Sequence, residues 1–436
     1  MNIDGDGLTV NNSGNILGTG NQRNGTAYAD GTADNYTLNN QAGGVIDAGA
    51  GNTGSGFAAE VGGATDGTTT FSVTNDGTIA GRGSALASGG SAGDGVRVGN
   101  AGDTGTFDGS IVNSGTISSE STNGTTAGIR TVDGVGFQGT LDNSGTVSGT
   151  QNGVYFGNAD HTGSVVNNSG TISSDSRAFN IDGNGLTVNN SGDILATGSQ
   201  RNGTLYVDGT SDNFTIQNSG SIDARGGSGS GVSVEVGSVA QNGSITNSGL
   251  IAGSGTNPLD AGIRLFSGAA GSTFSGDINN NLGGTITGGD VAAAVLFDLA
   301  VQFDGDLNNA GVIDGSIFLS DGDLNLDTTS ELFLEISSLT DFESIETTGL
   351  IDLDGTLNLV FDDFTPLVGQ QFDILDFGSI SGNFDFINAG GFVLDTTDLL
   401  VGGSVTISSV AVPEPSSLAV VGFVGLLFTA RRRRNS

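Results

Sequence analysis

The chain has 436 residues, of which 78 are glycine, and it carries 47 acidic residues against 12 basic ones. It contains no cysteine, which excludes disulfide frameworks, thiolate metal sites and a catalytic thiol. The formal net charge of -35 argues against nucleic-acid binding, because few cations are present to neutralise a phosphate backbone. Since apolar residues still recur at regular intervals, we expect the chain to fold.

The first part of the chain is built from a repeated motif, Asn-x-Gly-x followed by an aliphatic residue. The aliphatic positions recur about every 30 residues, which is the signature of a solenoid. Residues 2–40 also match residues 180–218 at 29 of 39 positions without a gap, so the repeat unit is modular. The aliphatic positions are Ile16, Ile46, Ile79, Ile117, Val147, Ile172, Ile194, Ile222, Ile251, Ile286 and Ile313.

Each repeat contains three short segments rich in Val, Ile, Thr and Phe, such as residues 96–98, 110–113 and 116–118. Segments of this kind, bounded by Gly, Asn, Asp and Ser, are typical of strands. Three strands per repeat predict a coil in which each strand pairs with its equivalent in the next coil. The sequence therefore predicts an all-β fold, a parallel β-helix of about eleven coils over residues 1–316.

The Asn-x-Gly corner of the repeat has a mechanical explanation. Both residue types tolerate the left-handed backbone conformation that a sharp corner needs. Asparagine side chains stacked at one corner of successive coils can also hydrogen-bond to each other along the rod. The alternative is that the asparagine row forms a sugar-binding face, and we expect the structural ladder instead.

The composition changes at residue 317, where glycine becomes rarer and Phe and Leu more frequent. Residues 332–336, 357–361 and 384–387 are examples of the longer, alternating segments found there. The last coil of a solenoid leaves an apolar, unpaired edge that another element must cover. Residues 317–410 are therefore predicted to form a β-rich cap.

The C-terminus is the one strongly cationic part of the chain. A Pro-Glu-Pro box, Pro413 to Pro415, precedes an apolar stretch and four consecutive arginines. As a helix, residues 418–430 would span about 20 Å, short of the roughly 30 Å of a hydrocarbon core. We expect a short C-terminal transmembrane helix whose arginines stay in the cytoplasm. The membrane residues are Leu418, Val421, Phe423, Leu426 and Phe428, and the topology residues are Arg431, Arg432, Arg433 and Arg434.

This ordered set over residues 411–436 resembles the PEP-CTERM sorting signal. The resemblance implies recognition by an exosortase-type membrane enzyme, export in a Gram-negative-type envelope, and a role in biofilm or extracellular polymer. It also implies that Pro413, Glu414 and Pro415 are recognition residues and not catalytic ones. The β-helical body, with residues 355–384, is similar to autotransporter passenger domains, which serve as adhesins.

An exported protein needs an N-terminal signal peptide with a basic region and an apolar core. Residues 1–7 have neither, and Met1 aligns with Phe179 in the duplicated segment. We therefore expect that the start of this chain is truncated or misassigned.

Catalysis has little support in the sequence. Polysaccharide lyases and hydrolases can also be β-helices, but they need carboxylates clustered with a residue that moves the proton. The only histidine, His161, lies in a polar segment where we expect it to be exposed. Arg97, Arg130 and Arg264 recur on the first strand of their coils. They either line a groove for acidic glycans or are solvated, and we expect the second.

No cofactor is expected, and weak calcium binding is the open alternative. Asp321, Asp323, Asn325 and Asp327 place oxygen donors at alternate positions. Neither an EF-hand loop nor a Gly-Gly-x-Gly-x-Asp repeat fits this segment, because its sixth position is Leu326.

The function we expect is that of a non-enzymatic, exported structural protein of the cell surface or extracellular matrix. Its partners would be the sorting enzyme, the membrane before its tail is processed, and extracellular polysaccharide. The alternative is a β-helical polysaccharide lyase or hydrolase that acts on extracellular glycans.

Overall fold

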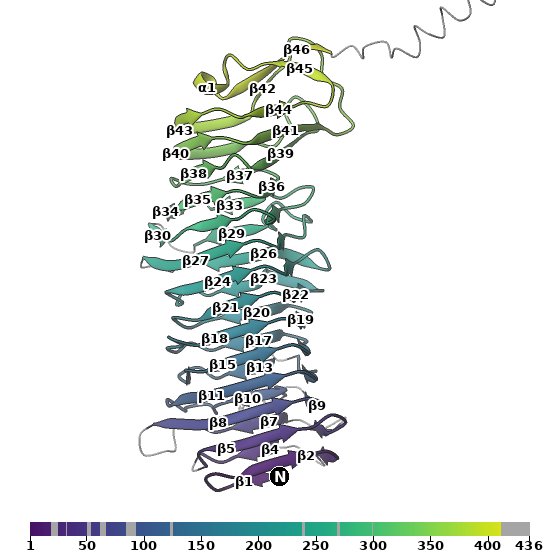
Figure 1. The fold of residues 1–436 in the computed structure, drawn as a ribbon, viewed down its shortest axis with the longest axis vertical. Coiled ribbons are helices and arrows are strands. Elements are labelled where there is room, and N and C mark those ends of the chain that lie inside the picture. Colours follow the sequence, from purple (N-terminus) through teal and green to yellow (C-terminus); the bar gives the residue numbers. More distant parts are fainter. Residues whose placement is uncertain are drawn as a thin grey trace, which may run out of the picture.

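The computed structural model describes residues 1–18, 25–31, 33–49, 54–61, 67–83, 93–122, 125–237, 240–267, 271–298 and 300–410. Over these residues the chain winds into a long rod of stacked turns (Figure 1). Strands pair in parallel from one turn to the next, in a 29-stranded and a 14-stranded sheet. The prediction of an all-β parallel solenoid is confirmed.

Each turn contributes strands at three positions along its course. The first strands are β1 (Asn2–Ile3), β4 (Gly25–Ala29), β7 (Ser55–Ala59), β10 (Val96–Val98), β13 (Ala127–Thr131), β17 (Asn152–Phe156), β20 (Arg177–Ile181), β23 (Ser199–Val207), β26 (Ser228–Glu235), β29 (Ile263–Phe266), β33 (Val295–Phe297) and β37 (Ile317–Phe318). The second strands are β2 (Thr9–Asn12), β5 (Tyr36–Asn40), β8 (Thr68–Asn75), β11 (Thr106–Asn113), β14 (Gly136–Phe137) with β15 (Thr140–Asn143), β18 (Val165–Asn168), β21 (Thr187–Asn190), β24 (Phe214–Asn218), β27 (Gln241–Asn247), β30 (Ser272–Ser275) with β31 (Ile278–Asn280), β34 (Val301–Phe303) with β35 (Asp306–Asn309), and β38 (Asp323–Leu326). Near the end of the rod, β40 (Ile345–Leu353) pairs with both β37 and β38, and β43 (Leu375–Gly382) pairs with β40.

The third strands make up the 14-stranded sheet. They are β3 (Asn15–Leu17), β6 (Val45–Asp47), β9 (Thr78–Gly81), β12 (Thr116–Ser119), β16 (Thr146–Gly149), β19 (Thr171–Ser174), β22 (Asp193–Ala196), β25 (Ser221–Asp223), β28 (Leu250–Ala252), β32 (Thr285–Thr287), β36 (Val312–Asp314), β39 (Glu331–Ile336), β41 (Thr356–Phe361) and β44 (Phe386–Asn388). The predicted aliphatic positions pair in register along this sheet, from Ile16 opposite Ile46 to Ile286 opposite Ile313. The repeat read from the sequence is therefore the rung of the solenoid.

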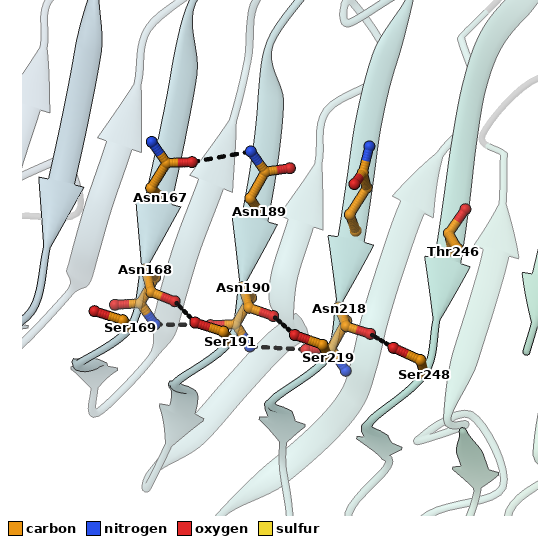
Figure 2. A pocket seen from close by; sticks show the side chains of 11 residues that line it. Asn167, Asn168, Ser169, Asn189, Asn190, Ser191, Asn218, Ser219, Thr246 and Ser248 are labelled. Carbon is orange, nitrogen blue, oxygen red and sulfur yellow. Dashed lines mark hydrogen bonds between the residues drawn. The ribbon is translucent and has the colours of Figure 1, made fainter. Parts of the chain in front are cut away.

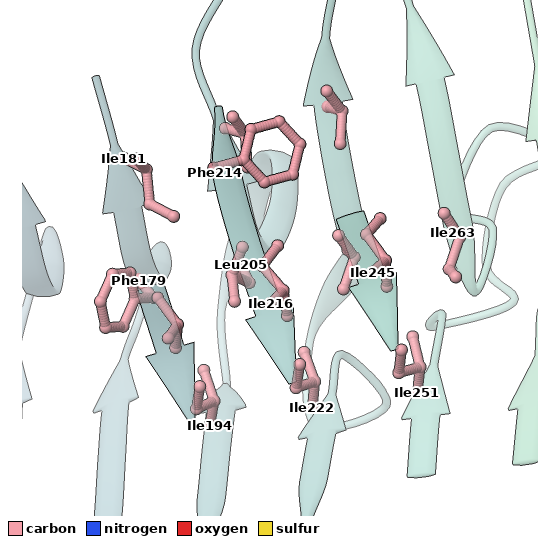
Figure 3. Packing of buried hydrophobic residues seen from close by; sticks show 14 of the residues in the cluster. Phe179, Ile181, Ile194, Leu205, Phe214, Ile216, Ile222, Ile245, Ile251 and Ile263 are labelled. Atoms are coloured by element: carbon pink, nitrogen blue, oxygen red, sulfur yellow. The ribbon is translucent and has the colours of Figure 1, made fainter. Parts of the chain in front are cut away.

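The core is a continuous apolar column inside the rod. Inward side chains from all three strand positions meet there, as Phe179, Ile194 and Ile216 do in Figure 3. Because each rung stacks its aliphatic residue on an equivalent one, the column has no break between turns. Full burial of one such side chain contributes about 1.5–3 kcal/mol, so stability accumulates rung by rung.

The motif glycines are required for a reason other than the one predicted. A Cβ added to Gly115 would lie 2.2 Å from the carbonyl oxygen of Gly77, and at Gly145 it would lie 2.2 Å from that of Gly115. Neither of these residues has a positive φ. The expected left-handed corner is therefore wrong at these positions, and glycine is needed because successive corners stack backbone against backbone.

The parallel sheets do not end at residue 317. The aliphatic row of the third strands continues from Ile313 through Leu332 and Leu357 to Ile387. An antiparallel sheet of β42 (Gln371–Asp373), β46 (Ser404–Val410) and β45 (Phe392–Asp395) then follows, with the short helix α1 (Leu399–Gly402). The region predicted as a cap thus begins as further rungs, since Leu and Ile can fill the same inward positions without the Asn-x-Gly corner.

The predicted C-terminal helix, residues 418–430, lies outside the described residues. Within the described part of the chain, no helix has the length and apolar character needed to cross a membrane.

Candidate functional site: the amide face and the arginine row

An unbroken ladder of buried asparagines runs along the corner between the second and third strands. Asn113 Nδ2 donates to Asn143 Oδ1 at 2.7 Å, and Asn143 Nδ2 donates to Asn168 Oδ1 at 2.8 Å. Each amide from Asn12 to Asn280 also donates to a backbone carbonyl of the next rung, as Asn143 does to Thr171 at 3.2 Å. The ladder comprises Asn12, Asn40, Asn75, Asn113, Asn143, Asn168, Asn190, Asn218, Asn247, Asn280 and Asn309.

The interpretation of the asparagine row as a structural ladder is confirmed, since these side chains are buried and hydrogen-bond to each other. At the end of the ladder, Asn309 Nδ2 donates to Ser330 Oγ at 3.2 Å. The change in composition after residue 317 therefore marks the end of the ladder and not the end of the parallel sheets.

A second polar column lies one residue before the ladder and points outward. Asn167 and Asn189 each precede a buried asparagine on their strands (Figure 2), and Gln217 holds the equivalent exposed position on β24. Together with the serines of the corner they line a shallow depression of about 360 Å³. We call this outward column the amide face. It comprises Asn11, Asn39, Thr74, Val112, Asp142, Asn167, Asn189, Gln217, Thr246, Asn279, Asn308 and Asn325.

The amide face is mostly an uncharged hydrogen-bonding surface, and its one carboxylate, Asp142, accepts from Asn167 Nδ2 at 2.7 Å. Asn189 Nδ2 donates to Asn167 Oδ1 at 2.9 Å, and Asn325 Nδ2 donates to Asn308 Oδ1 at 2.9 Å. Neighbouring rungs are about 4.8 Å apart, so donors and acceptors repeat at that interval along the rod. Such an array suits a long, hydroxyl-rich partner that lies parallel to the rod axis.

The predicted arginine row is found, but its side chains are not solvated. Arg97 and Arg130 pair in register on β10 and β13, and each is only 4 % exposed. Arg264 forms an ion pair with Asp298 at 2.9 Å. The expectation of exposed arginines was wrong because neighbouring side chains of this face, such as Tyr155 beside Arg130, cover them.

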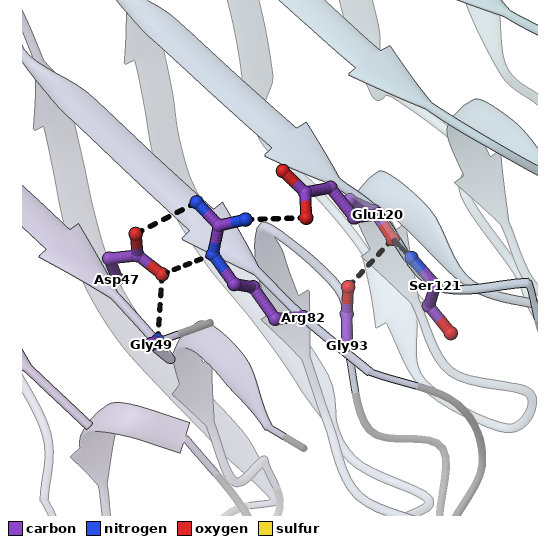
Figure 4. Close-up of polar contacts among 7 residues, drawn as sticks. Asp47, Gly49, Arg82, Gly93, Glu120 and Ser121 are labelled. Atoms are coloured by element: carbon purple, nitrogen blue, oxygen red, sulfur yellow. Dashed lines mark hydrogen bonds and ion pairs between the residues drawn. The ribbon is translucent and has the colours of Figure 1, made fainter. Parts of the chain in front are cut away.

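Arg82, which the sequence analysis did not single out, is held between rungs. Its Nε donates to Asp47 Oδ1 at 2.6 Å, and its Nη1 forms an ion pair with Glu120 (Figure 4). The guanidinium lowers the pKa of the Asp47 carboxyl. This bridge joins three successive turns beyond their backbone pairing.

A tyrosine–carboxylate row on the same face as Arg97 was missed from the sequence. Tyr155 OH donates to Asp182 Oδ2 at 2.6 Å, and Tyr28 and Tyr206 each donate to a glutamate one rung further on, Glu60 and Glu235. Burial raises the pKa of Asp182 to about 6. A partial signal was available at Tyr28 and Tyr206, which each lie two positions before an aspartate, as in Tyr206-Val207-Asp208, whereas Tyr155 is followed by Gly157 at that position.

His161 is buried, contrary to the expectation of an exposed side chain. Its Nδ1 accepts a hydrogen bond from the Phe137 backbone N–H at 3.1 Å, and its Nε2 donates to the Gly157 carbonyl at 2.8 Å. Its ring also packs edge-on against Phe156, with centroids 5.2 Å apart. These partners define the neutral tautomer with the proton on Nε2, and burial lowers the pKa of the ring. Both nitrogens are therefore occupied in holding a turn.

The four residues predicted as a weak calcium loop do not converge. Asp321 Oδ1 accepts from Phe303 N at 2.6 Å, and Asp323 Oδ1 accepts from Leu350 N at 2.7 Å. Asn325 belongs to the amide face, and Asp327 Oδ1 accepts from Thr329 N at 3.1 Å. Among the residues that the structure describes, no three carboxylate or histidine side chains gather in a group that could hold a metal ion.

The sorting residues Pro413, Glu414, Pro415 and Arg431 to Arg434 lie outside the described residues, as do the five membrane residues. Residues 411–434 match the family model of the PEP-CTERM protein-sorting motif. No curated protein matches the chain. The motif marks an exported protein of the cell envelope that is sorted through its C-terminus, and the body it carries is a parallel β-solenoid.

Proposed function

We propose that this protein is a non-enzymatic structural rod of the cell surface or extracellular matrix, with an adhesin-like role in biofilm. The observation that carries the proposal is the sorting motif at residues 411–434 of a chain whose body is a solenoid. A solenoid gives a long, stiff object whose faces repeat at regular intervals. An exosortase-type enzyme would recognise Pro413, Glu414 and Pro415, while residues 418–430 hold the tail in the membrane until it is removed.

Mass spectrometry of the mature protein tests this sorting step. We expect a C-terminus near Pro413 in protein recovered from the cell surface or the medium. The matched control replaces Pro413, Glu414 and Pro415 with alanine, which should leave an uncleaved tail and cell-associated protein. A mature chain that still ends at Ser436 would contradict the proposal, and so would normal processing of the alanine variant.

The adhesive part of the proposal rests on the amide face. We propose that neutral extracellular polysaccharide lies along this column, with its hydroxyl groups bonded to Asn167, Asn189 and Gln217. The surface carries many carboxylates, which disfavours an acidic polymer at this face. Affinity electrophoresis through gels containing a neutral glucan should retard the wild-type rod.

Two variants make the electrophoresis decisive. Replacing Asn167, Asn189 and Gln217 with alanine removes the amides without touching the buried ladder, and should abolish retardation. Replacing Ser148 and Ser173, which are half-buried outward positions on the third strands β16 and β19, should leave it unchanged. Equal retardation of the two variants would show that the amide face is not the binding surface.

The rival function is a β-helical polysaccharide lyase or hydrolase. Arg130, Tyr155 and Asp182 are the described residues that come nearest to a catalytic set, because they are neighbours and the pKa of Asp182 is raised to about 6 by burial. A general acid or base must reach the proton it transfers, and Arg130 and Tyr155 are buried. Turnover of acidic or neutral glycans that is lost in Asp182→Asn would favour the enzyme over the structural rod.

A further inference from the structure

A pocket of about 320 Å³ lies at the corner where the third strand of one turn leads to the first strand of the next. Its walls come from four successive turns, because Pro258, Asp290, Ser316 and Ser337 each lie between a third strand and the first strand that follows. Small-molecule sites in proteins occupy roughly 300–1,000 Å³. The pocket can therefore admit a small ligand, and it is separate from the amide face, which lies on the second strands.

Apolar side chains make up much of the lining. Ala292 and Ala293 line the pocket and are almost fully buried. Phe342 also lines it, and its ring packs edge-on against Phe372 with centroids 5.9 Å apart. Phe318 is a half-buried part of the same lining. Because these side chains offer contact area and no oxygen ligands, they suit an apolar body and not a metal ion.

Two glutamates of the pocket are held in place by hydrogen bonds. Glu343 Oε2 accepts from the Glu335 backbone N–H at 2.6 Å, and the Glu343 backbone N–H donates to the Glu335 carbonyl at 2.9 Å. Ser337 Oγ donates to Glu335 Oε1 at 2.8 Å. Asp290 and Asp341 also line the pocket. The apolar lining is therefore accompanied by carboxylates on several sides.

The neighbouring chain supplies little positive charge to these carboxylates. The sequence has no basic residue from 265 to 430, and Arg264, the basic residue nearest to them in sequence, is already in an ion pair. The pKa of Glu343 is raised to about 7 by burial, with a further contribution from the like charge of Asp314. Because a carboxylate withdrawn from water is costly without a counter-charge, the complementary group is a cation.

We propose that this pocket binds a small organic cation, a protonated primary amine carried on an aliphatic chain. The ammonium group lies against Glu335 and Glu343, and the aliphatic chain lies against Ala292, Ala293 and Phe342. Since the lining comes from four turns, the bound amine ties these turns together in the part of the rod where the asparagine ladder ends.

Isothermal titration calorimetry of the full chain with 1-hexylamine tests the site. At pH 8 a primary alkylamine is protonated, since its pKa is about 10.4, and the Glu343 carboxyl is largely ionised. We expect a single site for hexylamine. Hexanol, which lacks the charge, and ammonium chloride, which lacks the chain, should bind about tenfold more weakly or less. Equal affinity for either of them, or no binding of hexylamine, overturns the proposal.

Two variants with the same change in charge separate the pocket from the general acidity of the rod. Glu335→Gln combined with Glu343→Gln should weaken the binding of hexylamine about tenfold or more. Asp108→Asn combined with Asp193→Asn removes two exposed carboxylates elsewhere, and should bind hexylamine as the wild type does. An equal loss in both variants would show unspecific attraction to an acidic surface and refute the site.

Methyl nuclear magnetic resonance covers the case in which the glutamine variant does not fold, because it uses the wild-type chain. Hexylamine should shift the ¹³C-methyl signals of Ala292 and Ala293. It should leave in place those of Ala58 and Ala59, which are buried in β7. Shifts that are spread evenly over the rod, or confined to other parts of it, contradict the assignment.

Discussion

The asparagine ladder makes a quantitative prediction at Asn143, which lies near its middle. This side chain is 1 % exposed, accepts from Asn113 Nδ2 at 2.7 Å and donates to Asn168 Oδ1 at 2.8 Å and to the Thr171 carbonyl at 3.2 Å. Asn143→Ala leaves the Asn168 oxygen and the Thr171 carbonyl each short of one donor. Asn113 loses less, because its amide still donates to the Thr146 carbonyl at 3.1 Å.

A buried polar group left without a partner costs about 1–3 kcal/mol. Asn143→Ala leaves the Asn168 oxygen without its donor and weakens the bonding of the Thr171 carbonyl. We therefore expect a loss of about 2–4 kcal/mol in the free energy of unfolding. Asn143→Asp should be worse at neutral pH, since a buried carboxylate can accept from Asn113 but cannot donate to Asn168, and low pH should restore part of the loss.

Urea unfolding followed by circular dichroism measures this loss, and amide hydrogen exchange locates it. A solenoid can open in stages, so protection should fall first at the rungs that contain Thr146 and Thr171. The control is Asn167→Ala on the amide face, where an exposed change should cost less than about 0.5 kcal/mol. If Asn143→Ala and Asn167→Ala cost the same, the ladder does not stabilise the rod and the reasoning is refuted.

Three other groups give predictions that a pH series or a single substitution can check. His161 is held neutral with a lowered pKa, so its contribution to stability should fall as pH drops below about 6.5, the pKa of the unfolded chain. We expect the urea midpoint to fall less, or to rise more, from pH 7 to pH 5 in His161→Gln than in the wild type, and identical pH profiles would contradict this. Burial raises the pKa of Glu343 to about 7, so its contribution to folding stability is present below about pH 4.5 and is lost as pH rises through 7. Glu343→Gln should therefore be more stable than the wild type at pH 8 by about 1–3 kcal/mol. A urea midpoint equal to or lower than that of the wild type would contradict this. Arg82→Met should cost about 1 kcal/mol and the cost should shrink at high salt, whereas a salt-independent loss would point to packing.

The sequence was sufficient to predict the rung, because one inward aliphatic residue and one asparagine recur at each turn. Ile117 and Asn113 show how directly this worked, since both stack on their equivalents in the rungs on either side. The sequence did not predict where the parallel sheets stop. Leu332 and Leu357 continue the aliphatic row without the Asn-x-Gly corner. The change in composition after residue 317 therefore affects the corner residues, while the inward positions stay aliphatic.

The environments of the charged side chains could not be read from the sequence. His161 lies in a polar segment and Arg130 lies on a strand position that we expected to be solvated, yet both side chains are buried. Burial at these positions depends on the side chains of adjacent rungs. Because loop lengths vary between rungs, sequence spacing does not identify which residues become neighbours. The spacing between Tyr155 and Asp182, for instance, is 27 residues, while that between Tyr206 and Glu235 is 29. A row that is regular in space is thus irregular in sequence.

The asparagine ladder and the amide face differ in how much folding constrains their residue types. This can be seen by comparing equivalent positions in the successive rungs of the one chain. The buried column is asparagine at every rung from Asn12 to Asn309. The outward column beside it includes Val112 and Asp142 among its amides. In the duplicated pair, Asn39 corresponds to Gln217 while Asn40 corresponds to Asn218. Packing therefore requires asparagine only in the buried column. Folding leaves the residue type of the outward column open, so contacts with a partner can determine it.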